Sequence, residues 1–147
     1  VLVDGGFSNK LKLSNVDIIN EQLKNKSNHH FEDIINSTPS LNYSAGTARP
    51  RYFQIRGIGE LSQFSGEGAP HFYVSTIIDN IDFSGVGGVG LLDDIKQIEI
   101  FKGPQSTSFG PNAMAGVINF TSNKPTSIKK FKSSLTIGNK NTSKLSV

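Results

Sequence analysis

The chain has 147 residues, a length that suits one domain, or one domain and part of another. It has no cysteine, which excludes a disulfide scaffold, thiolate zinc sites and a cysteine nucleophile. The net charge of +3 hides a division, because the first hundred residues hold all 12 acids and 8 Lys or Arg, while the last 47 hold 7 Lys and no acid. We interpret the basic end as a strand-rich tail after an acidic domain rather than as a nucleic-acid surface.

No run reaches the ~18 apolar residues of a membrane-spanning helix. The first residues also lack the basic and apolar regions of a signal peptide. If the protein is secreted, we therefore expect this sequence to begin after processing or to be part of a longer chain.

The first third of the chain predicts a strand, short helices and a loop. Val16 and Ile18 alternate with polar residues, the period-2 pattern of a strand. Asn20 and Asn28 can each cap a short helix, and Pro39 ends the second one. One face of that second helix is apolar: Phe31, Ile34 and Ile35.

The middle of the chain predicts two strands and two loops. Phe53 and Ile55 face one side of a strand that continues to Arg56. Phe72, Val74 and Ile78 mark the next strand, which breaks at a turn pair, Asp79-Asn80. The loops cover 61–70 and 84–90, both rich in Gly. A single helical turn is expected near Leu91 to Ile95.

The stretch from Glu99 to Asn119 predicts a strand, a tight loop and a second strand. Ile98 and Ile100 alternate with Gln97 and Glu99. The first strand ends at Lys102-Gly103-Pro104, because Pro has no N–H for a central ladder. Small residues and Gly then allow backbone to approach backbone closely. Val117 to Phe120 forms the second strand, so we expect a small mixed sheet overall.

The pattern changes after Pro125. Two alternating segments, 131–137 and 142–147, flank a turn at 138–141. Such a hairpin is typical both of transmembrane barrel strands and of soluble antiparallel strands, and the residues by themselves do not choose between them.

Three motifs closely resemble the plug domain of TonB-dependent outer-membrane receptors. The first is the run from Glu99 through Lys102-Gly103-Pro104 and Phe109-Gly110 to Gly116-Val117-Ile118-Asn119. The second is Ile55-Arg56-Gly57, and the third is Ile78-Asp79-Asn80 where the family usually has Asp-Gly. Lys102 and Ser40 stand where the family usually has Arg and Gly.

The resemblance implies an α+β plug over 1–125, with short helices, followed over 126–147 by the first hairpin of a transmembrane β-barrel. It also implies a place inside a barrel of about 22 strands in the outer membrane of a Gram-negative cell. The expected partners are the chain's own C-terminal barrel, TonB with ExbB and ExbD, and an extracellular small molecule or metal chelate. Ferric siderophores, haem, cobalamin and saccharides are the expected substrates.

The resemblance also assigns roles to residues. Arg56, Glu99 and Lys102 are expected to pair with charges of the barrel wall and to seat the plug. The two loops are hypothesised to face the substrate, and their predicted contacts are Gln63, Phe64, Gly87 and Gly88. The motif positions with an expected structural role are Gly57, Gly103, Pro104, Gly110, Gly116 and Asn119.

The same residues support other functions less well. The G-x-G-x-x-G of 85–90 lacks the long helix and later acid of a dinucleotide site, so an NAD-type enzyme is not favoured. His29 and His30 point about 100° apart on a helix, which argues against a metal site shared with His71. We expect no enzyme, cofactor or nucleic-acid partner. The alternative is a soluble α+β ligand-binding module unrelated to transport.

Overall fold

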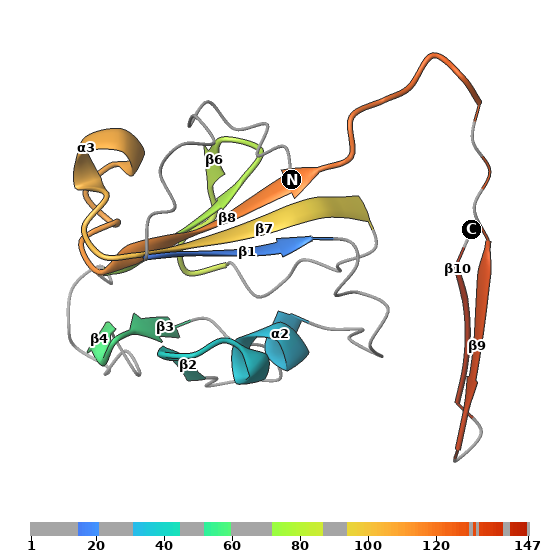
Figure 1. Cartoon of the computed structure of the whole chain (residues 1–147), viewed down its shortest axis with the longest axis horizontal. Coiled ribbons are helices and arrows are strands. Elements are labelled where there is room, and N and C mark those ends of the chain that lie inside the picture. Colours follow the sequence, from blue (N-terminus) through green and yellow to red (C-terminus); the bar gives the residue numbers. More distant parts are fainter. Residues whose placement is uncertain are drawn as a thin grey trace.

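A computed structural model describes residues 15–20, 31–44, 52–59, 72–86, 94–129, 131, 133–139 and 142–146, and the structural statements below concern these residues. The largest unit is a five-stranded sheet in the order β1-β7-β8-β5-β6 (Figure 1). Its strands are β1 (Val16–Asn20), β5 (Val74–Ile78), β6 (Ile81–Asp82), β7 (Ile95–Lys102) and β8 (Gly116–Ser122). Strands β5 and β8 are parallel, and the other pairs are antiparallel. The predicted mixed sheet is confirmed.

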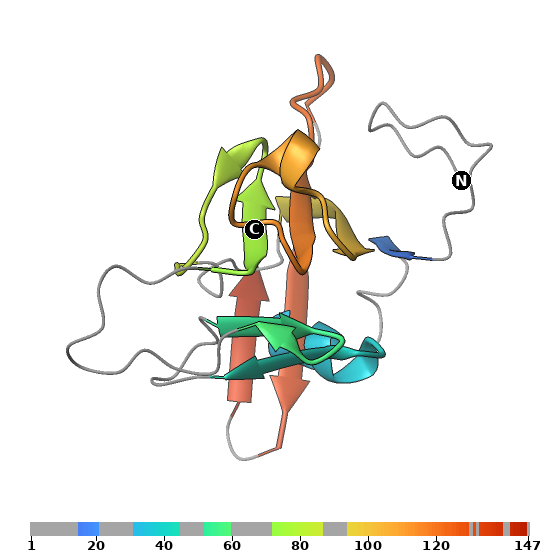
Figure 2. The same ribbon diagram turned by 90° about the vertical axis from the view of Figure 1, so that its left-hand side faces the viewer.

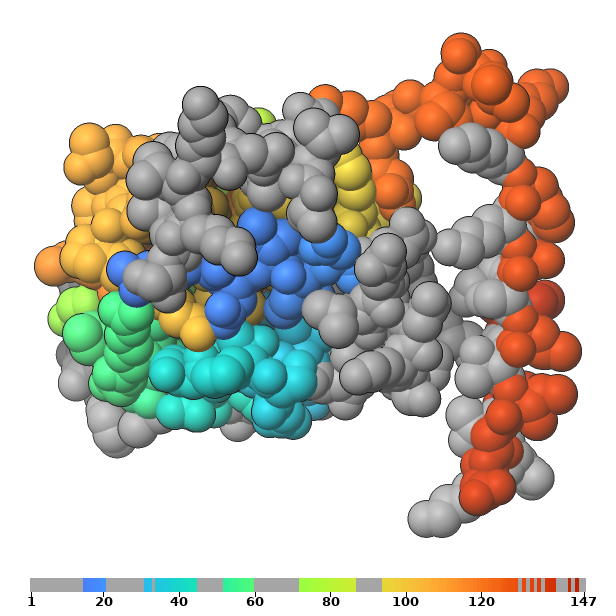
Figure 3. Space-filling model, viewed as in Figure 1, coloured from blue at the N-terminus to red at the C-terminus, as the bar shows by residue number. Residues whose placement is uncertain are grey.

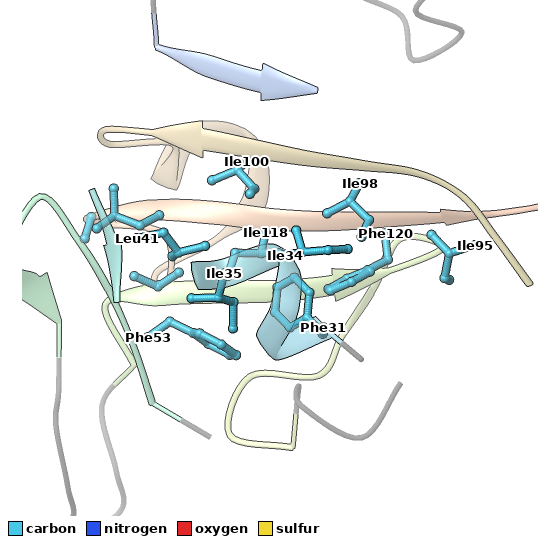
Figure 4. Close-up of a cluster of buried hydrophobic side chains, with 13 residues drawn as sticks. Phe31, Ile34, Ile35, Leu41, Phe53, Ile95, Ile98, Ile100, Ile118 and Phe120 are labelled. Atoms are coloured by element: carbon cyan, nitrogen blue, oxygen red, sulfur yellow. The ribbon is translucent and has the colours of Figure 1, made fainter. Parts of the chain in front are cut away.

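A second layer covers one face of this sheet (Figures 1 and 2). It consists of helix α2 (Phe31–Ser37) and a three-stranded antiparallel sheet of β2 (Leu41–Ser44), β3 (Tyr52–Ile55) and β4 (Ile58–Gly59). Helix α2 turns its predicted apolar face to the core, where the Phe31 ring lies 4.9 Å from Phe120 and 5.8 Å from Phe53 (Figure 4). Edge contacts between the rings add to the burial of apolar surface.

Two hairpins turn in two residues each. Arg56 and Gly57 have φ of 55° and 77°, and Asp79 and Asn80 have 48° and 69°. Two successive positive φ values suit the right-handed twist of the flanking strands. The turn at Asp79-Asn80 is confirmed, but the prediction that Arg56 continues the strand is wrong, because β3 ends at Ile55 and Arg56 begins the turn.

The segment around β7 differs from the prediction in two places. The helical turn expected near Leu91 to Ile95 is described only at Asp94, which is helical, and at Ile95, which already begins strand β7. A bulge between Ile95 and Gln97 leaves Lys96 exposed. The predicted loop after Pro104 contains a single helical turn, α3 (Ser106–Phe109). The Phe109 ring on α3 packs on Phe101, with centroids 5.6 Å apart.

The last two strands, β9 (Ser134–Gly138) and β10 (Thr142–Ser146), form the predicted antiparallel hairpin, which Figure 1 shows apart from the two layers. Leu135 pairs with Leu145 in register. These two residues and Ile137 are each at least 65% exposed. Over the described part of the chain, no helix has the length and apolar character needed to cross a membrane.

Candidate functional site

Strands β7 and β8 present two chemically different faces. One face contributes Ile98, Ile100, Ile118 and Phe120 to the core beneath α2. The other carries Gln97 and Glu99 on β7, with Asn119 directly opposite Glu99 on β8. Glu99 is only 6% exposed although it carries a carboxylate. The sheet therefore buries an ionisable group on the side away from the main core.

Neutral amides hold the Glu99 carboxylate. The Gln97 Nε2 donates to Oε1 at 2.8 Å, and the Asn119 Nδ2 donates to Oε2 at 2.9 Å. Within the described ranges, no Lys, Arg or His forms an ion pair with Glu99. Because each carboxylate oxygen can accept more than one hydrogen bond, and because a buried charge is costly unless paired, this site can accept a cation.

A pocket of about 360 Å³ opens over these residues. Phe101 and Phe109 supply an apolar part of its wall, and Asp79, Lys96 and Lys124 contribute charged groups. Glu99 and Asn119 were singled out in the sequence, but Gln97 was not, although its spacing of two from Glu99 on a strand placed both on one face. An apolar wall beside a carboxylate suits a long cationic side chain such as Arg.

Arg56 and Lys102 reach a common segment. The Arg56 Nη2 donates to Asn15 Oδ1 at 2.7 Å, and the Lys102 Nζ lies 2.6 Å from Asp17 Oδ2. Asn15 directly precedes β1, and Asp17 lies within it. Both cations thus bind the beginning of β1, and their pairing with a barrel wall remains a prediction.

Gly116 begins β8 at a close approach between layers. A Cβ there would lie 2.3 Å from the Phe101 backbone oxygen and 2.6 Å from Ile55 Cδ1. Gly57 occupies the hairpin turn described above. The other motif positions lie around α3: Gly103 and Pro104 follow β7, and Gly110 follows the helix.

The predicted substrate contacts Gln63, Phe64, Gly87 and Gly88 lie outside the described residues, as do His29, His30 and His71. What the structure does describe is where the two loops begin or end. Phe72 stacks on Tyr52 with centroids 6.2 Å apart, and a Cβ on Gly85 would lie 2.4 Å from the Phe72 ring. The stems of the loops at 61–70 and 84–90 therefore meet, through an aromatic pair that the sequence did not single out.

Two acids near the β5–β6 hairpin are held by neutral donors. Hydrogen bonds from the Ser122 hydroxyl and backbone N–H lower the pKa of Asp79. Partial burial acts to raise the pKa of Asp82, but bonds from Ser84, Asn112 and Ser75 outweigh it and leave the pKa below its ordinary value. Both carboxylates therefore act as fixed hydrogen-bond acceptors that hold the hairpin.

A family model described as TonB-dependent Receptor Plug Domain matches residues 10–117. The chain belongs to this plug family. Plug domains are parts of transporters, so the NAD-type enzyme is excluded and the soluble ligand-binding module is not favoured. The motifs around Arg56-Gly57 and Lys102-Gly103-Pro104 fall inside the matched range.

Solved receptors share the fold of this plug. The ferric yersiniabactin uptake receptor FyuA from Yersinia pestis is 22% identical over 77% of this chain, with a TM-score of 0.60. The ferric-catecholate import receptor Fiu from E. coli K12 is 24% identical over 77%, with a TM-score of 0.55. The FrpB iron transporter from Neisseria meningitidis is 18% identical over 75%, with a TM-score of 0.55. The matches cover 17%, 15% and 17% of those three chains, so this chain spans a small part of their length.

Proposed function

We propose that this plug closes the lumen of an outer-membrane barrel and gates energised uptake of a ferric chelate. The family match supports the gating role, and the named substrates of FyuA and Fiu favour a ferric siderophore over haem, cobalamin or a saccharide. The proposed partners are TonB with ExbB and ExbD, and the proposed location is the outer membrane of a Gram-negative cell. Residues 126–147, with the exposed apolar residues of β9 and β10, are proposed to begin the barrel wall.

The observation that carries the seating of the plug is the Glu99 pocket. A buried carboxylate that two neutral amides bind among the described residues, under a pocket with an aromatic wall, fits an Arg or Lys from the surrounding barrel. Pairing would offset the cost of burying the charge. Such a polar contact is also easier to break and remake than an apolar one, as a plug that must move requires.

Substrate recognition is proposed for the two Gly-rich loops, whose stems meet at Phe72 and Gly85. Gln63, Phe64, Gly87 and Gly88 remain the proposed contacts. Replacing both Gln63 and Phe64 with Ala is expected to weaken substrate binding and to leave insertion into the outer membrane intact. Unchanged affinity in the full-length protein would contradict this assignment.

Uptake can be tested in a Gram-negative strain that lacks its own receptors and expresses the full-length protein carrying this chain. We expect radiolabelled iron to enter as a ferric siderophore, and uptake to stop when TonB is deleted. Uptake of haem, cobalamin or a saccharide instead would reassign the substrate. No TonB-dependent uptake of any of them would overturn the proposed function.

Seating can be tested separately through permeability to large antibiotics. Glu99→Leu is expected to make the strain more sensitive, because the wall cation loses its partner. Asn42→Leu, which changes an exposed residue on β2 outside the pocket, should leave sensitivity unchanged. Equal sensitivity of the two variants would argue against the pocket as a seat.

A further inference from the structure

Strand β1 is an edge strand of the five-stranded sheet and has few buried contacts. Among the strands that the structure describes, it lies at the sheet edge and pairs only with β7, over five residues. All five are partly exposed, and β1 lies at the surface of the face shown in Figure 3. Of its five residues, Ile19 packs against the core beneath α2, and Val16 packs against a second apolar cluster of Ile77, Phe101, Ala113 and Val117. Edge strands with few buried apolar contacts are the parts of a fold that open at the lowest free energy.

The polar contacts of β1 are concentrated at its N-terminal end. Besides the Arg56 and Lys102 side-chain contacts, the Lys102 backbone N–H donates to the Asn15 carbonyl at 2.7 Å. At the opposite end, the buried Asn20 Oδ1 has no hydrogen-bond partner among the described residues. The strand is therefore fastened where the chain comes in from residues 1–14.

Backbone hydrogen bonds fix the chain at Arg56 and next to Lys102. The backbone N–H of Arg56, in its two-residue turn, donates to the Ser40 carbonyl at 2.8 Å. Lys102 ends the interior strand β7, and the next backbone N–H, that of Gly103, donates to the Ala115 carbonyl at 3.0 Å. Because β1 is an edge strand and the backbone at Arg56 and Lys102 is hydrogen-bonded to other parts of the fold, we expect β1 to move when it separates from the sheet, while the two cations stay in place.

The Lys102 contact is the stronger of the two. The Lys102 side chain is 11% exposed and the Asp17 side chain 38%. The approach of Nζ to the buried Asp17 Oδ2 is an ion pair outside hydrogen-bonding angles. Arg56 and Asn15 are both exposed, so water competes for their hydrogen bond. The Lys102–Asp17 pair is partly buried, so removing one partner leaves the other charge less well compensated, which costs more than losing an exposed contact.

We propose that Arg56 and Lys102 form an electrostatic clamp on Asn15 and Asp17, and that this clamp sets the free energy at which β1 leaves the sheet. Release of β1 separates both cations from these partners at once. In the proposed function, a pull from the N-terminal side would meet this clamp before any other strand. The clamp itself is a property of the fold, so a test that does not measure transport can contradict it without touching the proposed function.

Hydrogen exchange in the full-length protein, followed by mass spectrometry, tests the clamp. Lys102→Met is expected to speed exchange in peptides covering 15–20 about tenfold or more, which corresponds to about 1.4 kcal/mol. Arg56→Gln should speed it about two- to fivefold, because its contact is exposed. Exchange in 116–122, the internal reference in β8, should change little. Lys96→Met is the matched control on β7 and should change neither segment.

A charge exchange separates an electrostatic clamp from a packing effect. Asp17→Lys alone should speed exchange of β1, and Asp17→Lys combined with Lys102→Asp should restore much of the protection. Unchanged exchange of β1 in Lys102→Met would overturn the proposal, as would equal acceleration in β1 and β8. Failure of the exchanged pair to restore protection would also overturn it. Arg56→Gln and Asp17→Asn are milder variants that keep the test decisive if Lys102→Met does not fold.

Discussion

The two faces of the β7–β8 pair have the same backbone and opposite chemistry. One face buries Ile98, Ile100, Ile118 and Phe120 beneath α2, while the other sets Glu99 between two amides under an open pocket. Burial of apolar surface is the main source of folding free energy, so the first face holds the domain together. The second face carries the Glu99 charge beside a smaller apolar cluster of Ile77, Phe101, Ala113 and Val117. The larger apolar core and the exchangeable polar contact thus lie on opposite sides of two strands.

The largest expected effect comes from the apolar face. Ile118→Ala should lower the free energy of unfolding by about 2–5 kcal/mol, because Ile118 is fully buried and its loss leaves a cavity. Urea unfolding of the chain, followed by circular dichroism, measures the change. Ile128→Ala is the matched control, because Ile128 is 71% exposed and its truncation should cost less than about 0.5 kcal/mol.

A smaller loss of stability is expected from a substitution at Gly116, where the two layers approach each other. Gly116→Ala should cost about 1–3 kcal/mol, since its Cβ would meet the Phe101 carbonyl and the Ile55 side chain. The same urea titration measures it. Combining it with Ile55→Val, which removes the Ile55 Cδ1 atom, should recover only part of the loss because the backbone contact remains. Full recovery would show that the clash with backbone is unimportant.

Loss of the Glu99 charge on the polar face should hardly change the free energy of unfolding in the same urea titration. Glu99→Leu removes a buried charge, and the amides of Gln97 and Asn119 can turn to water in the pocket, so we expect a change within about 1 kcal/mol. A loss as large as that of Ile118→Ala would break the comparison, because it would make the polar face a source of stability.

The smallest expected change in the free energy of unfolding comes from a polar residue on the apolar face, Thr76. Thr76 pairs in register with Ile118, and its buried Oγ1 has no partner among the described residues. Thr76→Val should therefore be neutral or stabilise the chain by up to about 1 kcal/mol. Thr38→Val is the control, because the Thr38 hydroxyl donates to the Ile34 carbonyl at 2.8 Å, and its loss should cost about 1 kcal/mol. A larger loss of stability in Thr76→Val than in Thr38→Val would contradict this account.

Local patterns predicted much of this architecture. The spacing of Phe31, Ile34 and Ile35 on a helix, and of Ile98 and Ile100 on a strand, reports which side chains can share a face. The turn at Asp79-Asn80 follows from residues that tolerate a positive φ. Arg56 was misplaced because a charged residue after two alternating apolar residues fits both a strand and a turn, and the pairing of Ile55 with Ile58 decided between them.

The sequence by itself determined the mixed α+β class, the apolar faces and the motifs that mark the plug family, because these depend on neighbours along the chain. Only the tertiary structure decided what the charges do. Lys102 meets Asp17, and Glu99 meets Asn119, across separations in sequence that no local period encodes. The partner of a charged side chain depends on which strands are neighbours, and strand order is set by the packing of the whole sheet.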